Sequence, residues 1–183
     1  MIKKSIALAL VTLGFAGAAS AATFGVGVDS ATVKDSGVSV TTSAARAFVE
    51  APVYKNLTVE AGVSSAHGRI AADGLGVVSS NARALDVSAK YVFSNGFNVR
   101  VGSSVVELAG VSDTKEFASV GYDYKLGAAS VAKLAVTKSS GLDGVVPSVT
   151  VEYDLSKNIR ARASVSKAEG VNPAVGLGVA YRF

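Results

Sequence analysis

The chain has 183 residues, of which 49% are hydrophobic and only 17% are charged, with a net charge of +4. This length fits one domain, and the composition excludes a disordered chain and argues against a nucleic-acid-binding protein. Because there is no cysteine and only one histidine, disulfides, cysteine nucleophiles, thiolate metal sites and sites with two imidazole ligands are also excluded. We therefore expect no metal, no cofactor and no nucleic-acid partner.

Residues 1–21 predict a secretory signal peptide. The segment begins with Met-Ile-Lys-Lys, continues with an apolar stretch over residues 6–18 and ends with Ala-Ser-Ala, which are the three parts of such a leader. A transmembrane helix would need about 20 apolar residues, and this stretch is shorter. We expect cleavage after Ala21 and a mature domain that comprises residues 22–183.

The rest of the chain alternates with a period of two, which is typical of β-strands. At the end of the chain, for example, the apolar set is Val175, Leu177, Val179, Tyr181 and Phe183. The intervening positions are mostly Gly, Ala, Ser and Thr with a few charges, which suits the crowded interior of a small barrel better than the water-facing side of a secreted β-sandwich. We therefore predict an all-β fold: a closed, antiparallel, up-and-down transmembrane barrel whose apolar faces meet lipid.

Turn signals divide the chain into ten predicted strands, near residues 23–30, 38–53, 57–67, 82–93, 97–108, 115–124, 129–138, 145–155, 159–168 and 174–183. Merging the weak first hairpin would leave eight strands. Connections after even strands are short, and those after odd strands, such as residues 68–81 and 139–144, look longer. Since short turns are periplasmic in such barrels, both termini are expected on the periplasmic side.

Aromatic residues gather at the short-turn ends of these strands. Amphipathic rings favour the boundary between membrane and water, so we interpret this set as a periplasmic girdle. Its members are Tyr54, Tyr91, Phe93, Phe97, Tyr122, Tyr124, Tyr153, Tyr181 and Phe183.

Eleven charged residues fall on the inward face of the predicted strands: Arg46, Glu50, Glu60, Asp86, Lys90, Arg100, Asp123, Lys133, Glu152, Arg160 and Arg162. Charges in a narrow lumen are costly unless they are paired. The near-balance of acids and bases therefore predicts a salt-bridge network that fills the barrel. A wide aqueous pore would need about 16 strands.

The leader ending Ala-Ser-Ala, the hairpin Tyr-Asp-Leu-Ser-Lys-Asn-Ile over residues 153–159 and the terminal Val-Ala-Tyr-Arg-Phe resemble small outer-membrane β-barrels of Gram-negative bacteria, the OmpA-like and porin-like group. The resemblance implies an integral outer-membrane location, contact with membrane lipid and lipopolysaccharide, and recognition of Tyr181 and Phe183 by the barrel assembly machinery. It concerns class rather than activity, because the group contains porin-like, adhesin-like, enzymatic and structural members.

We expect a structural or narrow-channel role. The alternatives are a small porin that passes ions or small solutes, and an adhesin or phage-receptor module whose external ligand the sequence does not identify. An enzyme is disfavoured, because barrel proteases and lipid A-modifying barrels need a histidine with carboxylate or hydroxyl partners. His67 is the single histidine, Asp73 is its nearest acid in sequence, and we expect His67 in an exposed loop.

Overall fold

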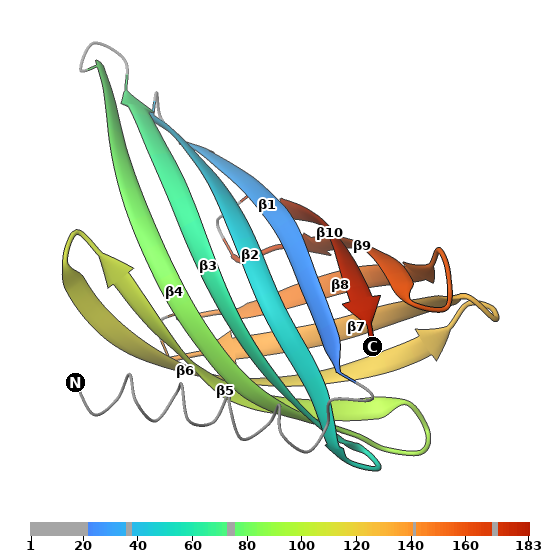
Figure 1. The fold of residues 1–183 in the computed structure, drawn as a ribbon. Coiled ribbons are helices and arrows are strands. Elements are labelled where there is room, and N and C mark those ends of the chain that lie inside the picture. Colours follow the sequence, from blue (N-terminus) through green and yellow to red (C-terminus); the bar gives the residue numbers. More distant parts are fainter. Residues whose placement is uncertain (1–21, 36–37, 73–75, 141, 170–171) are drawn as a thin grey trace.

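The computed structural model describes residues 22–35, 38–72, 76–140, 142–169 and 172–183. These residues form a closed barrel of ten antiparallel strands, which confirms the predicted fold and excludes the eight-stranded alternative (Figure 1). The predicted leader lies outside the described residues. The strands are β1 (Thr23–Asp35), β2 (Val38–Tyr54), β3 (Leu57–Ala72), β4 (Gly76–Val92), β5 (Phe97–Leu108), β6 (Val111–Lys125), β7 (Ser130–Ser139), β8 (Val145–Asp154), β9 (Ile159–Ser166) and β10 (Ala174–Arg182).

The barrel closes where β1 pairs with β10, in a register that runs from Thr23 opposite Arg182 to Ser30 opposite Val175. The last residue continues this seam, because the amide of Phe183 donates a hydrogen bond to the carbonyl of Ala22 over 3.0 Å. Closure of the barrel gives hydrogen-bond partners to the backbone groups that would be unpaired at the edges of an open sheet. Among the described residues, no helix is long and apolar enough to cross a membrane.

Alternate residues face opposite sides of the barrel wall, as the period of two requires. The apolar set faces outward: Val26 and Leu177 are 48% and 61% exposed. The small and charged set faces the lumen, where glycines Gly25 and Gly178 lie on β1 and β10. An apolar exterior around a polar interior is the arrangement of a membrane barrel.

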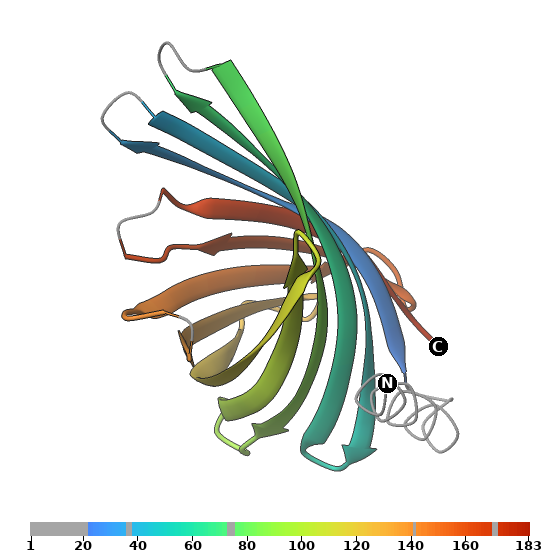
Figure 2. The same cartoon turned by 90° about the vertical axis from the view of Figure 1, so that its left-hand side faces the viewer.

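The strands differ widely in length. β2, β3 and β4 have 17, 16 and 17 residues, whereas β8, β9 and β10 have 10, 8 and 9. A tilted strand crosses the hydrocarbon with about 9–11 residues, so β8–β10 just span it and β2–β4 continue beyond it. The hairpins β1–β2 and β3–β4 accordingly reach farther than the others (Figure 2).

The long strands correct the predicted loops. Residues 68–72 and 76–81, expected in a loop, extend the β3–β4 ladder. The β5–β6 connection is also tight, since only Ala109 and Gly110 lie between the strands, both with positive φ (51° and 81°). The prediction that connections after odd strands are long is therefore wrong for the connections after β1, β3 and β5. In the β3–β4 hairpin the cause is that the outward positions turn polar, at Arg69 and Ser79, while Ile70 and Val78 lie on the inner face, so the apolar-outward alternation that predicts a strand is lost.

The two described ends of the chain lie at one end of the barrel, together with the four turns that follow even strands, because β1 begins opposite the end of β10. The predicted aromatic girdle lies at this same end. Its rings touch along the strands: the centroids of Tyr91 and Phe93 are 4.9 Å apart, and those of Tyr181 and Phe183 are 5.1 Å apart. Phe24, opposite Tyr181 in the ladder, is a further outward ring there that the sequence analysis missed.

Candidate functional site: the charged lumen

The predicted lumen charges mostly meet one another. Nine of the eleven form ion pairs: Arg46, Glu60, Lys90, Arg100, Asp123, Lys133, Glu152, Arg160 and Arg162. The other two, Glu50 and Asp86, occupy inward positions in the ladder but form no ion pair with another described residue. The pairs lie within the first few inward positions from the short turns, so the network occupies that half of the lumen.

Glu152 on β8 is the most buried charge of the network, with 3% exposure. Its carboxylate accepts from Lys133 Nζ at 2.8 Å, from Arg160 at 2.9 Å and from Arg162 at 2.8 Å. Arg160 is shared, because its Nε also donates to Asp154 at 2.6 Å. One acid thus ties together three neighbouring strands, β7, β8 and β9.

A second cluster centres on Glu60 of β3. One of its carboxylate oxygens accepts from Arg46 of β2 at 2.6 Å and from Arg100 of β5 at 2.8 Å. Arg100 also donates to the hydroxyl of Ser88, which is buried, at 2.9 Å. Since β3 and β5 are not neighbours in the sheet, the pair between Glu60 and Arg100 passes over β4 on the lumen side.

A third cluster joins β4, β5 and β6. Lys90 donates to Asp123 at 2.7 Å, and the amide nitrogen of Asn98 donates to the other carboxylate oxygen at 2.9 Å. Asn98 is buried and was absent from the predicted set. The acid is thereby satisfied from two strands, which is what a charge needs in a largely dehydrated interior.

Two inward phenylalanines complete the filling, and the sequence analysis missed both. Arg162 lies over the ring of Phe48 at 5.1 Å, and Arg100 lies over the ring of Phe117 at 5.4 Å, within the range of cation–π contact. Arg162 belongs to β9 and Phe48 to β2, so this contact passes over two intervening strands, β10 and β1, on the lumen side. Phe48 has room because a Cβ on Gly25 would fall only 2.2 Å from its ring.

The opposite half of the lumen is lined by small side chains. On β3 and β4 the inward positions there are Ser64, Ala66, Ala82 and Ala84, and on β10 they include Gly176. Charges also face inward in this half, namely Asp29 beside Gly176 and the Lys115–Asp113 pair of β6 at 2.6 Å. The lumen is therefore asymmetric along its axis in degree: most charges and rings gather near the short turns, and small residues predominate toward the long hairpins. Such an interior can exclude or slow solutes.

His67 lies in β3 and not in a loop, which corrects the prediction. It faces outward, and its Nδ1 lies 2.8 Å from Oδ1 of Asn81 on β4. Since an amide oxygen accepts, Nδ1 donates this hydrogen bond. Asp73, the acid nearest in sequence, lies outside the described residues. Across the described ranges, no three metal-ligating side chains gather into a cluster.

Asp154 and Arg182 are further lumen charges that the alternation could have identified. Asp154 follows Glu152 by two positions and so shares its face, and Arg182 continues the inward series of β10. A guanidinium nitrogen of Arg182 lies 4.0 Å from Asp154, which extends the network to the chain end.

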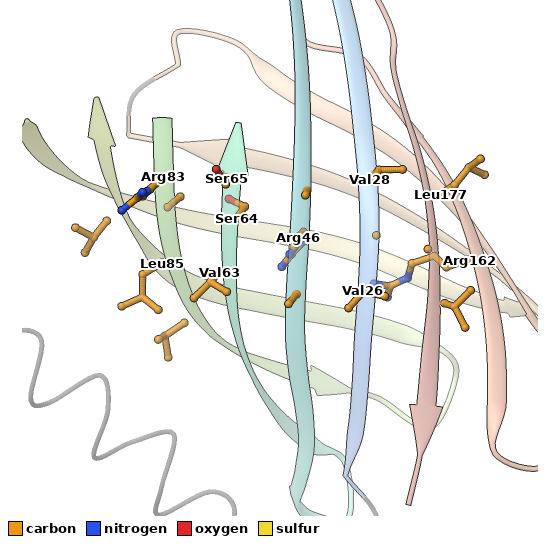
Figure 3. Close-up of a pocket in the computed structure, with 18 of the residues that line it drawn as sticks. Val26, Val28, Arg46, Val63, Ser64, Ser65, Arg83, Leu85, Arg162 and Leu177 are labelled. Atoms are coloured by element: carbon orange, nitrogen blue, oxygen red, sulfur yellow. The ribbon is translucent and has the colours of Figure 1, made fainter. Parts of the chain in front are cut away.

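One concavity is a groove of about 1900 Å³, lined mainly by outward side chains that come from every strand except β7. Its body is apolar and includes Val26, Val63, Leu85 and Leu177, whereas Ser65 and Arg83 lie side by side at one end (Figure 3). Outward alanines of β2 and β9 are also among its lining residues. The groove therefore belongs to the membrane-facing exterior.

No family model and no curated protein matches this chain. Solved structures do match in fold. An outer membrane channel from Pseudomonas putida F1 has a TM-score of 0.56 at 12% identity, over 90% of this chain and 96% of the channel. The β-domain of the Bordetella autotransporter BrkA has a TM-score of 0.56 at 10% identity, over 90% of this chain and all of that domain. The translocator domain of the autotransporter NalP from Neisseria meningitidis has a TM-score of 0.51 at 11% identity, over 99% and 95%. The fold is thus that of outer-membrane β-barrels.

Proposed function

We propose that this protein is an integral barrel of the Gram-negative outer membrane whose lumen is closed by the charge-and-ring network, and that its role is structural. The observation that carries this proposal is the set of inward contacts that bridge non-neighbouring strands, between Arg162 of β9 and Phe48 of β2 and between Arg100 of β5 and Glu60 of β3. An apolar exterior with an aromatic girdle supports the membrane location. In this orientation the short turns and both chain ends face the periplasm.

Planar-bilayer recording tests the closed lumen. We expect the refolded mature chain to show no steady conductance. The variant R46S/E60S/R100S removes one cluster whole, so it leaves no stranded partner within that cluster, and it should stay folded and gain conductance. The matched outward change, Val101→Ser, should remain silent. Steady conductance of the unaltered protein would overturn the proposal.

A narrow channel is the second candidate. Its support is the small-residue lining of the outer half of the lumen, together with the fold shared with an outer membrane channel. A channel would conduct before any substitution, and charge changes at Glu60 or Glu152 would alter its ion selectivity. A closed barrel would instead respond to the same changes through lost stability.

We propose no enzymatic role. His67 faces the exterior and bonds an amide, and neither a carboxylate nor a hydroxyl is hydrogen-bonded to its ring among the described residues. The adhesin alternative is tested on the projecting β3–β4 hairpin. Shortening it by residues 68–81 should leave insertion intact, and simultaneous loss of cell or phage binding would favour a receptor role.

A further inference from the structure

The inner face of the projecting β1–β4 sheet is apolar at its outer end. Val40, Ile70 and Val78 are consecutive partners in the ladder across β2, β3 and β4, so they form one row on this face. Ile70 and Val78 are 42% and 62% exposed. The outward positions beside this row are polar, at Arg69 and Ser79. A sheet with one apolar and one polar face normally packs a partner against its apolar face, so this row is a candidate docking surface.

The rows that lead from this surface toward the short turns carry small side chains. They are Thr42, Gly68 and Ser80, followed by Ala44, Ala66 and Ala82. The alanine row lies four residues from the row of valine and isoleucine, or about 13 Å along the strands. A barrel of about eight strands can hold one small ligand, and ten strands lined by such residues leave space for an elongated one. The path from the apolar row into the lumen therefore suits an alkyl chain.

Two acids lie where this path reaches the middle of the lumen. Asp29 of β1 is the ladder partner of Ala44 and is exposed. Asp86 of β4 faces inward, four residues nearer the short turns than Ala82, and is half-buried. Neither carboxylate forms an ion pair with another described residue. An unpaired charge in a partly dehydrated interior is costly, so both positions favour a cationic partner.

The inward bases nearest to these acids are already paired. Arg46 is bound to Glu60 at 2.6 Å, and Lys115 is bound to Asp113 at 2.6 Å. Arg100 shares Glu60 with Arg46, which leaves one positive charge in that cluster against the two unpaired acids. The spare charge in the described middle and outer parts of the lumen is therefore negative.

We propose that the outer half of the lumen binds a long-chain primary alkylammonium ion. Asp29 and Asp86 attract the ammonium group, and the alkyl chain runs outward over the alanine row to the row of Val40, Ile70 and Val78. Asp86 and Val78 are eight residues apart on β4, or about 26 Å along the strand, which requires a long chain. The two acids would repel a carboxylate with the same chain. This inference goes beyond the proposed structural role, and binding at this site requires neither closure of the lumen nor conduction.

Fluorescence of the refolded barrel in phosphatidylcholine nanodiscs tests the site. The chain has no tryptophan, so Ser80→Trp places a single reporter on the inner face, and Ser79→Trp places the matched reporter on the outward face. The probe is octadecylammonium with a nitroxide near its chain end, which quenches an indole ring that it contacts. We expect saturable quenching of Ser80→Trp. For Ser79→Trp we expect only the gradual quenching caused by probe dissolved in the bilayer. Thr42→Trp, in the same inner row as Ser80, is a second reporter.

Substitutions in the Ser80→Trp background test the charged end of the ligand. D29N/D86N should weaken binding of the probe roughly ten- to hundredfold, because the ammonium group loses charged hydrogen-bond acceptors. The control E107Q/E116Q removes two carboxylates from the outward faces of β5 and β6 and should bind like the parent. Nitroxide-labelled octadecanoate, which has the same chain length and the opposite charge, should bind the parent weakly.

Three results would overturn the proposal. These are equal saturable quenching of the inner and outer reporters, equal affinity of the parent and D29N/D86N, and equally tight binding of the labelled octadecanoate. Ile70→Ser should also weaken binding, and an unchanged affinity in that variant would contradict an alkyl chain on the apolar row. Heat-modifiable migration on gels confirms that each variant is folded. Quenching does not depend on conductance, so failure of this site and failure of the closed-lumen proposal give separate signals.

Discussion

Replacing Glu152 with glutamine should destabilise the barrel strongly, and the reason lies in its three partners. The substitution keeps the volume of the side chain but removes the charge that Lys133, Arg160 and Arg162 share. Arg160 keeps Asp154 at 2.6 Å, and Arg162 keeps the ring of Phe48 at 5.1 Å. The ammonium group of Lys133 keeps no described acid. A buried pair that loses one member costs about 3–5 kcal/mol, and we expect the lower end of that range here.

The pattern of rescue distinguishes this explanation from general damage. Adding Lys133→Met to Glu152→Gln removes the stranded ammonium group and should restore about 1–3 kcal/mol, the size of coupling found between contacting residues. Adding Arg160→Gln should restore less, because it strands Asp154. Lys133→Met should therefore restore more of the lost stability than Arg160→Gln.

The free energy of unfolding can be measured by guanidinium titration in lipid vesicles. The chain has no tryptophan, so far-UV circular dichroism and heat-modifiable gel migration are suitable probes. Stability of Glu152→Gln within about 0.5 kcal/mol of the parent, the size of an ordinary surface change, would refute the reasoning. So would strictly additive effects of the two substitutions in either double variant.

Three further predictions concern assembly, the exterior and packing. Deleting Phe183 should leave unfolded periplasmic protein, because the hydrogen bond from its amide to the carbonyl of Ala22, next to β1, extends the barrel seam; a normal yield of heat-modifiable barrel in outer-membrane fractions would contradict this. Val87→Arg should cost about 2–4 kcal/mol in vesicle unfolding, as for a charge on the lipid face, while Ser79→Arg in the projecting hairpin should be nearly neutral. If Val87→Arg and Ser79→Arg were tolerated equally, the assignment of Val87 to the lipid-facing side would be wrong. Gly25→Val should prevent the ring of Phe48 from packing, since even a Cβ would lie 2.2 Å away, and a parent-like unfolding midpoint would argue against that packing.

The facing of the strands could be predicted because hydropathy changes at every residue within the membrane band. Once Glu152 faces inward, Thr150 and Asp154 must do so as well, and the same counting assigns Arg160 and Arg162. Strand number followed from the turns. The ion pairs were predicted as a class, because balanced charges on one face of a closed wall have few other partners.

Register across the lumen could not be predicted in this way. The contact between Phe48 and Arg162 depends on the closure of the barrel, which brings β2 and β9 within two strands of each other, and on the space left by Gly25, which no local pattern encodes. The projecting ladder of β3 and β4 could not be predicted from the sequence for a different reason. Its outward positions turn polar, at Arg69 and Ser79, whereas Ile70 and Val78 lie on the inner face, so residues 68–81 lose the apolar-outward alternation by which the other strands are recognised.

The projecting part of the barrel wall is not a closed ring. β10 pairs with β1 only as far as Ser30, and β5 pairs with β4 only from Ala82. Residues 31–35 and 76–81 therefore form the two free edges of a four-stranded sheet, whose outer amides have no ladder partner among the described residues. Opening this sheet breaks far fewer contacts than opening the ring below it. Amide hydrogen exchange should accordingly be fast along these two edges and slow in the membrane band, so the barrel combines a cooperative ring with an overhang that opens independently.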